Sequence, residues 1–105
     1  MLNIWKMGKE HNFKVGDIIT IKNRKTLKKD LLHLLNQDNY NPVGYWDILS
    51  CKRVKIMLIN DHCKAYVNSK YKDCLLLESI DGDKSISGHY YPIDIFDENL
   101  NEKNK

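Results

Sequence analysis

The sequence predicts a small, mainly β domain: a β-barrel of about five strands, with one amphipathic helix inserted between the first and second core strands. A Gly16-Asp17 turn leads into the alternating run Ile18-Ile19-Thr20-Ile21-Lys22, which is how many small barrels begin. The stretch from Thr26 to Gln37 then changes to a helical period, whereas later apolar runs alternate again. A chain of 105 residues suits one domain with one core.

The helical period is carried by leucines. Leu27, Leu31, Leu34 and Leu35 fall at i, i+4, i+7 and i+8, which is the apolar stripe of an amphipathic helix. Thr26 precedes this stripe and is the predicted N-cap. The polar segment 36–44 contains Pro and Gly, so it predicts the end of the helix and a long loop.

Further strands are predicted after this loop. The segment 53–60 alternates, with Val54, Ile56 and Leu58 on one face, and 74–80 is a third strand. Asp81-Gly82 predicts a hairpin turn, with a returning strand from about 84 to 91. Pro92 ends that strand because it cannot donate to a sheet, and 93–96 forms a turn that packs Ile93 or Phe96 into the barrel end. The barrel therefore spans 13–97, the helical insertion 26–37, and a frayed polar tail 98–105.

Charge is distributed unevenly along the chain. Residues 1–72 hold 14 Lys/Arg against 6 Asp/Glu, whereas residues 73–105 hold 3 against 8, within a formal net charge of +3. Such asymmetry indicates a surface that seeks acidic partners, unless folding interleaves the two halves so that their charges neutralise one another.

The basic residues concentrate near the predicted helix start. Lysines beside a helix N-terminus oppose its dipole, and a bound anion would relieve that conflict. Exposed rings flanking the long loop could stack on bases or anchor a protein interface, although packing in the loop or core would also account for them. The candidate contacts with nucleic acid or an acidic partner are Lys22, Arg24, Lys25, Lys28, Lys29, Lys52, Arg53 and Lys55, and the aromatic candidates are Tyr40, Tyr45 and Trp46.

Catalytic and metal-binding patterns are weak in this sequence. It has no Gly-rich phosphate loop, no His-Glu-x-x-His and no Gly-x-Ser-x-Gly, and His33 lies beside the leucine stripe as a boundary residue would. A zinc site would need His62, Cys63 and Cys74 to converge with Cys51 or His89, a spacing typical of no tight zinc motif. We therefore expect no enzyme activity, no cofactor and no metal.

The cellular location is predicted from cysteines and apolar runs. Three cysteines cannot all pair within one chain, and this favours a reducing compartment. No apolar run is long enough to cross a bilayer, and the first residues lack the pattern of a secretory signal. We expect a cytoplasmic protein that does not enter a membrane, either a monomer or a homodimer formed through a sheet edge.

Four segments together resemble a known family. They are 14–21, 51–56, the Asp81-Gly82 turn and the closing Tyr90-Tyr91-Pro92-Ile93-Asp94-Ile95-Phe96-Asp97. Over residues 13–97 the chain resembles small Src-homology-3-like (SH3-like) β-barrel proteins of bacteriophages and bacterial mobile elements. The resemblance implies an SH3-like barrel and a phage or mobile-element origin, in which case the protein would act in the host cell.

These observations favour a non-catalytic binding module that docks a basic surface onto an acidic partner. The partner would be a nucleic acid, or a nucleic-acid-binding host or defence protein that the module inhibits. The alternative is a protein–protein adaptor that uses the barrel groove and the aromatic loop without nucleic acid. A small thiol or zinc enzyme is a distant third hypothesis.

Overall fold

The computed structural model describes residues 10–34, 47–61, 66, 68–81, 86 and 89–104. Within these residues, four strands form one antiparallel sheet in chain order: β1 (Ile18–Thr20), β2 (Arg53–Asn60), β3 (Cys74–Ser79) and β4 (Tyr90–Pro92). The α-helix α2 (Arg24–Leu34) follows β1, as the sequence predicts. Short 3-10 turns complete the described fold: η1 (Asp47–Ser50), η3 (Ile93–Ile95), η4 (Glu98–Leu100) and η5 (Glu102–Asn104). The result is a small domain of mixed helix and strand.

The inner face of the sheet forms the core. Ile19 opposes Val54 and Leu75 opposes Tyr91, and all four side chains are fully buried. The predicted alternation of β2 fails after Ile56, because a β-bulge shifts the register there. Leu58 is consequently 49% exposed instead of sharing the buried face of Val54 and Ile56.

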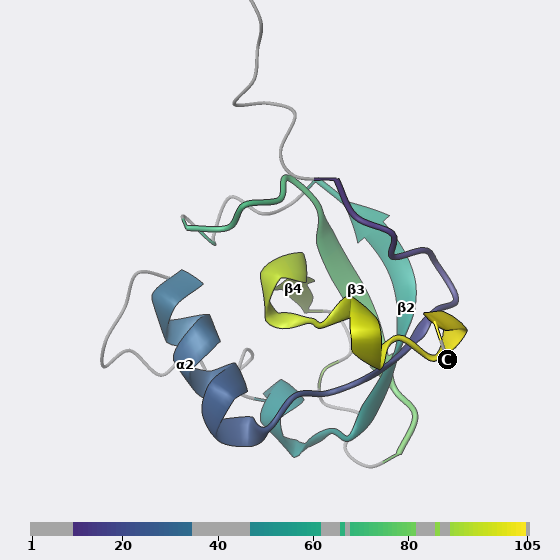
Figure 1. The fold of residues 1–105 in the computed structure, drawn as a ribbon, viewed down its shortest axis with the longest axis horizontal. Coiled ribbons are helices and arrows are strands. Elements are labelled where there is room, and N and C mark those ends of the chain that lie inside the picture. The colour runs from purple at the N-terminus through teal and green to yellow at the C-terminus, as the bar shows by residue number, and fades with distance from the viewer. Residues whose placement is uncertain are drawn as a thin grey trace, which may run out of the picture.

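The helix covers one side of this core. Leu27, Leu31 and Leu34 are buried, and α2 packs against η1 and η3. Figure 1 shows β4 and the turn after it lying between α2 and the strands β2 and β3. The predicted helix start is wrong by about one turn, because Asn23 caps α2: its Oδ1 accepts a hydrogen bond from the Lys25 N–H at 2.9 Å. Thr26 is therefore the third helical residue.

The predicted strand boundaries hold for β2 and nearly for β3, but the returning strand predicted from about 84 to 91 is too long. It begins only at Tyr90, since Ile86 lies in a turn and His89 lies outside any strand. The bounds of β2 match the prediction, β3 ends one residue early, and Pro92 is the last residue of β4. Turn η3 follows directly, and it buries Ile93 and Ile95. Gly82 of the predicted hairpin, residues 84 and 85, and helix residues 35–37 lie outside the described part of the chain. The described residues contain no fifth strand.

Residues 98–104 are folded, so the prediction of a frayed tail is wrong for them. Asn101 is 1% exposed and forms an isolated antiparallel bridge with Ile19 on the edge of β1. The Asp17 carboxylate accepts hydrogen bonds from the Asn101 side chain at 2.9 Å and the Lys14 N–H at 2.8 Å, and Lys103 Nζ lies 3.0 Å from it. Burial tends to raise the pKa of Asp17, but these hydrogen bonds and the Lys103 charge outweigh burial and lower it.

The cysteines depart from the prediction in one respect. Cys51 is buried and is not part of a disulfide, in keeping with a cysteine that packs as a small hydrophobic side chain. Cys74, in contrast, is disulfide-bonded. A disulfide is uncommon in a reducing compartment, so the cysteine count does not support the location inferred from it.

Candidate functional site

The start of α2 presents a set of exposed cations. Arg24, Lys25, Lys28 and Lys29 are all exposed, and the first turn of α2 contains no acidic residue. Lys25 lies three and four positions before Lys28 and Lys29, so these ammonium groups are neighbours on the helix surface. Each like-charged pair costs about 0.2–0.5 kcal/mol of helix stability.

A further exposed cation, Lys52, comes from a different part of the chain, just before β2. The Ile21 N–H, just after β1, donates to the Lys52 carbonyl at 2.8 Å, only three residues before α2 begins. Turn η1, which precedes Lys52, packs against α2. Lys52 is exposed, and its backbone lies beside the segment that leads into α2. We call the following exposed cations the basic face: Arg24, Lys25, Lys28, Lys29 and Lys52.

Three other candidates from the sequence serve different contacts. Lys22, which precedes α2, forms an ion pair with Asp30 of the helix, with Nζ 3.4 Å from Oδ2. Arg53 donates to Glu102 Oε1 through both Nε, at 3.0 Å, and Nη2, at 2.7 Å. Lys55 is exposed, but it stands opposite Glu78 on the neighbouring strand, where opposite charges attract. The candidate aromatic contacts Tyr40, Tyr45 and Trp46 lie outside the described residues.

A hollow of about 420 Å³ opens beside the C-terminal half of α2. Asn68, on the side of the hollow opposite α2, is hydrogen-bonded to the end of the helix. Its side chain donates to the His33 carbonyl at 2.7 Å, and its N–H donates to the Leu34 carbonyl at 3.2 Å. These bonds occupy carbonyls that a helix end otherwise leaves unpaired. The hollow is lined by Lys22, Asp30, His33, Leu34, Asn68, Lys70, Tyr71, Asp94 and Phe96.

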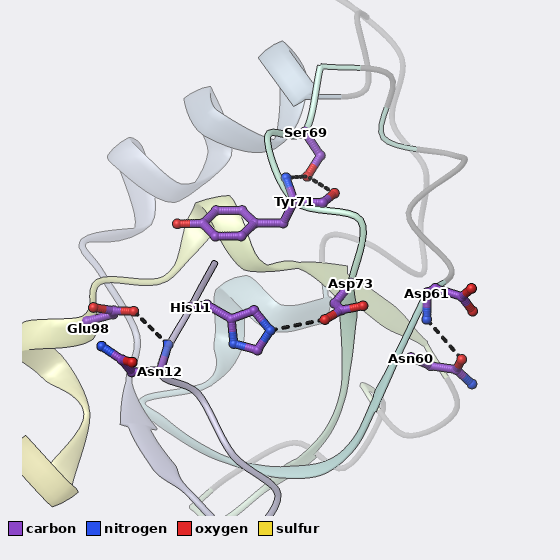
Figure 2. A network of polar contacts seen from close by, with 8 residues as sticks. All are labelled: His11, Asn12, Asn60, Asp61, Ser69, Tyr71, Asp73 and Glu98. Carbon is purple, nitrogen blue, oxygen red and sulfur yellow. Dashed lines mark hydrogen bonds and ion pairs between the residues drawn. The ribbon is translucent and has the colours of Figure 1, made fainter. Parts of the chain in front are cut away.

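The wall opposite α2 is held rigidly by Asp94. Its Oδ1 accepts a hydrogen bond from Ser69 Oγ at 2.5 Å, and its Oδ2 accepts one from the Lys70 N–H at 2.8 Å. Ser69 Oγ also bonds the backbone of Tyr71, which fixes the turn that presents the Tyr71 ring (Figure 2). The position of Tyr71 is therefore set by the protein before any ligand arrives.

Tyr71 separates this hollow from a second one of about 320 Å³, lined by Glu10, His11, Asn12, Tyr71 and Glu98. His11 Nε2 lies 3.1 Å from Asp73 Oδ2, and the His11 ring meets the Tyr71 ring edge-on, with centroids 6.1 Å apart (Figure 2). Among the described residues, the buried His11 Nδ1 has no hydrogen-bond partner. His11 lies 62 residues before Asp73 in the sequence, so no sequence pattern joins it to Asp73 and the nearby Tyr71.

The described residues show little that would support catalysis by a metal. Within them, no three His, Cys, Asp or Glu side chains are grouped to hold an ion. His62 and Cys63 of the hypothetical zinc site lie outside that part of the chain. No helix in the described part has the length and apolar character needed to cross a bilayer.

No protein-family model, curated protein or solved structure matches this chain. The chemistry of the site must therefore be argued from the chain's own residues.

Proposed function

We propose that this protein is a non-catalytic binding module that docks its basic face onto the phosphate backbone of a nucleic acid. The observation that carries the proposal is a group of exposed cations: Arg24, Lys25 and Lys29 lie together on α2 with no acid in the first turn and, among the described residues, no carboxylate paired with them. Lys22, Arg53 and Lys103, in contrast, each pair with a carboxylate. A phosphate backbone would replace the repulsion among the α2 cations with attraction and release its own counterions.

Asn23 refines how an anion would bind. It occupies the Lys25 N–H, so one of the backbone donors at the helix start is already satisfied. The attraction therefore comes mainly from side-chain charges, which track a polyanion without reading its sequence.

The proposal includes a fold of the SH3-like barrel type. The antiparallel order of β1 to β4, the 3-10 turn after β4 and the bridge from Asn101 to Ile19 support it, because the bridge brings the C-terminal segment back to the first strand. An origin in a phage or mobile element, action in a host cytoplasm and inhibition of a nucleic-acid-binding defence protein rest on the sequence resemblance alone.

The test is fluorescence anisotropy with labelled oligonucleotides across a salt series. Two variants each remove two charges: Lys25→Gln/Lys29→Gln on the basic face, and Lys14→Gln/Lys55→Gln away from it. We expect the first variant to reduce the slope of log affinity against log salt by about two, since each lysine contacts about one phosphate, and the control to leave it nearly unchanged. No binding by the wild type at low salt, or equal loss in both variants, would refute the proposal.

A protein–protein adaptor is the second candidate, and one observation favours it. At the β2 bulge Met57 and Leu58 are 39% and 49% exposed, and the bond from the Gly16 N–H to the Ile56 carbonyl brings the exposed Val15 to the same region. An adaptor contact made there would be nearly insensitive to salt, unlike one made through the basic face.

A further inference from the structure

The basic face continues into the 420 Å³ hollow beside α2. Lys25, Lys29 and His33 follow one another at four-residue spacing, so they form one row along the helix surface. The first two belong to the basic face, and His33 lines the hollow. A strand whose phosphates follow Lys25 and Lys29 would therefore reach the opening of the hollow at His33.

The hollow changes character from outside to inside. His33 and Lys70 are exposed, and within the described residues no hydrogen bond or ion pair engages the Lys70 ammonium or the His33 ring. Deeper in, Leu34 and Phe96 are buried and Tyr71 is half-buried. A rim with a lysine ammonium and an imidazole offers donors to a phosphate, and the half-buried Tyr71 ring beside it offers a surface on which a flat, apolar group can pack.

The two carboxylates of the hollow are both engaged by protein donors. Asp30 is paired with Lys22, and Asp94 accepts hydrogen bonds from Ser69 and from the Lys70 N–H. Among the described residues, neither carboxylate forms an ion pair with the Lys70 ammonium, so this group is available to a phosphate.

The aromatic interior is held in place before binding. Phe96 meets Phe13 edge-on, with centroids 6.4 Å apart, and Tyr71 meets His11 in the same way at 6.1 Å. A base that packs against such fixed rings does not have to order them first, and this lowers the entropic cost of binding.

From these features we propose that the hollow binds one unpaired nucleotide of a single-stranded nucleic acid. The phosphate is held by Lys70 and His33, and the base packs against Tyr71 and Phe96. The volume falls within the range of about 300–1,000 Å³ typical of small-ligand sites. Bases stacked inside a duplex cannot enter such a site. The inference rests on the proposed function and narrows its ligand to a single-stranded nucleic acid.

The first experiment compares single-stranded and duplex oligonucleotides of equal length by anisotropy. Lys70→Gln is matched by Lys72→Gln, because both lysines are exposed and Lys72 does not line the hollow. We expect a preference of the wild type for the single strand, a loss of that preference in Lys70→Gln, and wild-type behaviour in Lys72→Gln. Tyr71→Leu should weaken single-strand binding by roughly 5- to 150-fold, the range for one base–aromatic stack, whereas Tyr71→Phe, which keeps the ring, should not.

The second experiment examines the hollow without the basic face. Adenosine monophosphate, ribose 5-phosphate and adenosine are titrated into the isotope-labelled protein, and amide shifts are followed by NMR. Shifts at residues 33 and 68–71 that are largest with the complete nucleotide would support the inference.

The outcomes separate the two proposals. Salt-sensitive binding with equal affinity for duplex and single strand, and no nucleotide shifts, would overturn the inference and leave the proposed function standing. Nucleotide shifts in the hollow without salt-sensitive oligonucleotide binding would overturn the proposed function and support the hollow as a nucleotide site.

Discussion

At the residue scale, Asp17 links the first strand to the C-terminal segment. Its carboxylate accepts from Lys14 and Asn101 and pairs with Lys103, and its side chain is only 11% exposed. Since its folded pKa lies below the unfolded value of about 3.9, the stability it contributes is present above that pH and is lost as pH falls through the folded pKa.

We expect Asp17→Asn to lower the free energy of unfolding by about 1–3 kcal/mol at neutral pH, because a charged acceptor of several hydrogen bonds is removed. Urea denaturation at pH 7 and near pH 2.5 checks this. The difference from the wild type should shrink at the lower pH, whereas the exposed Asp61→Asn should match the wild type at both. A difference that does not depend on pH would show that the charge of Asp17 is not involved.

Individual site residues could be predicted only where the chain itself groups them. Lys25, Lys28 and Lys29 are neighbours through the helical period, which the leucines reveal in the sequence. Lys70 and Tyr71 reach the helix through Asn68 and Asp94, and those contacts depend on how the segment before β3 folds back. No periodicity encodes that return, so the hollow could not be foreseen.

At the element scale, α2 illustrates what hydrophobic period can and cannot specify. The leucine stripe correctly predicts the buried face, but the first helical residue is decided by capping, and Asn23 competes with Thr26 for that role. A similar limit applies to β2, since alternation predicts its bounds but not the bulge after Ile56. Both features depend on local backbone hydrogen bonds, which the apolar pattern does not report.

The positive charges of α2 predict that a change which stabilises the protein will weaken its binding of nucleic acid. Lys25→Glu places an acid in the first turn of α2, which favours the helix dipole by about 0.3–1 kcal/mol, and turns two repulsions, with Lys28 and Lys29, into attractions. We expect a higher melting temperature together with weaker oligonucleotide binding. Lys25→Gln should be intermediate in stability, because it removes the repulsion without the dipole term. A lower melting temperature for Lys25→Glu would contradict this prediction, because it would mean that Lys25 stabilises the protein without a ligand.

At the scale of the whole molecule, folding neutralises much of the opposition between the two halves of the sequence. Glu102 returns to Arg53 and Asp73 to His11, so these acids of the second half meet partners in the first, while the Lys103 cation returns to the Asp17 carboxylate. Among the described residues, Arg24, Lys25 and Lys29 of the basic face take no part in these pairs. Part of the charge asymmetry of the sequence is therefore neutralised by folding, and part stays as exposed cations on α2.

The C-terminal segment provides the strongest test of this architecture. Removing residues 98–105 deletes the backbone bridge to Ile19, the buried Asn101 and both ion pairs, and it exposes the edge of β1. We expect a loss of several kcal/mol, a large part of the roughly 5–15 kcal/mol that stabilises a domain, visible as a much lower melting temperature by circular dichroism.

Two milder variants separate the contributions within this segment. Glu102→Gln/Lys103→Gln removes the ion pairs but keeps the bridge, and should cost about 1 kcal/mol or less per pair because these groups are partly exposed. Asn101→Ala should cost about 1–3 kcal/mol, since Asn101 is buried and its amide donates to the Asp17 carboxylate. If the truncated chain melted within a few degrees of the full chain, the segment would be a frayed tail after all. If it unfolds while the double variant does not, the bridge from Asn101 to Ile19, with its buried side chain, is what holds β1 in the sheet.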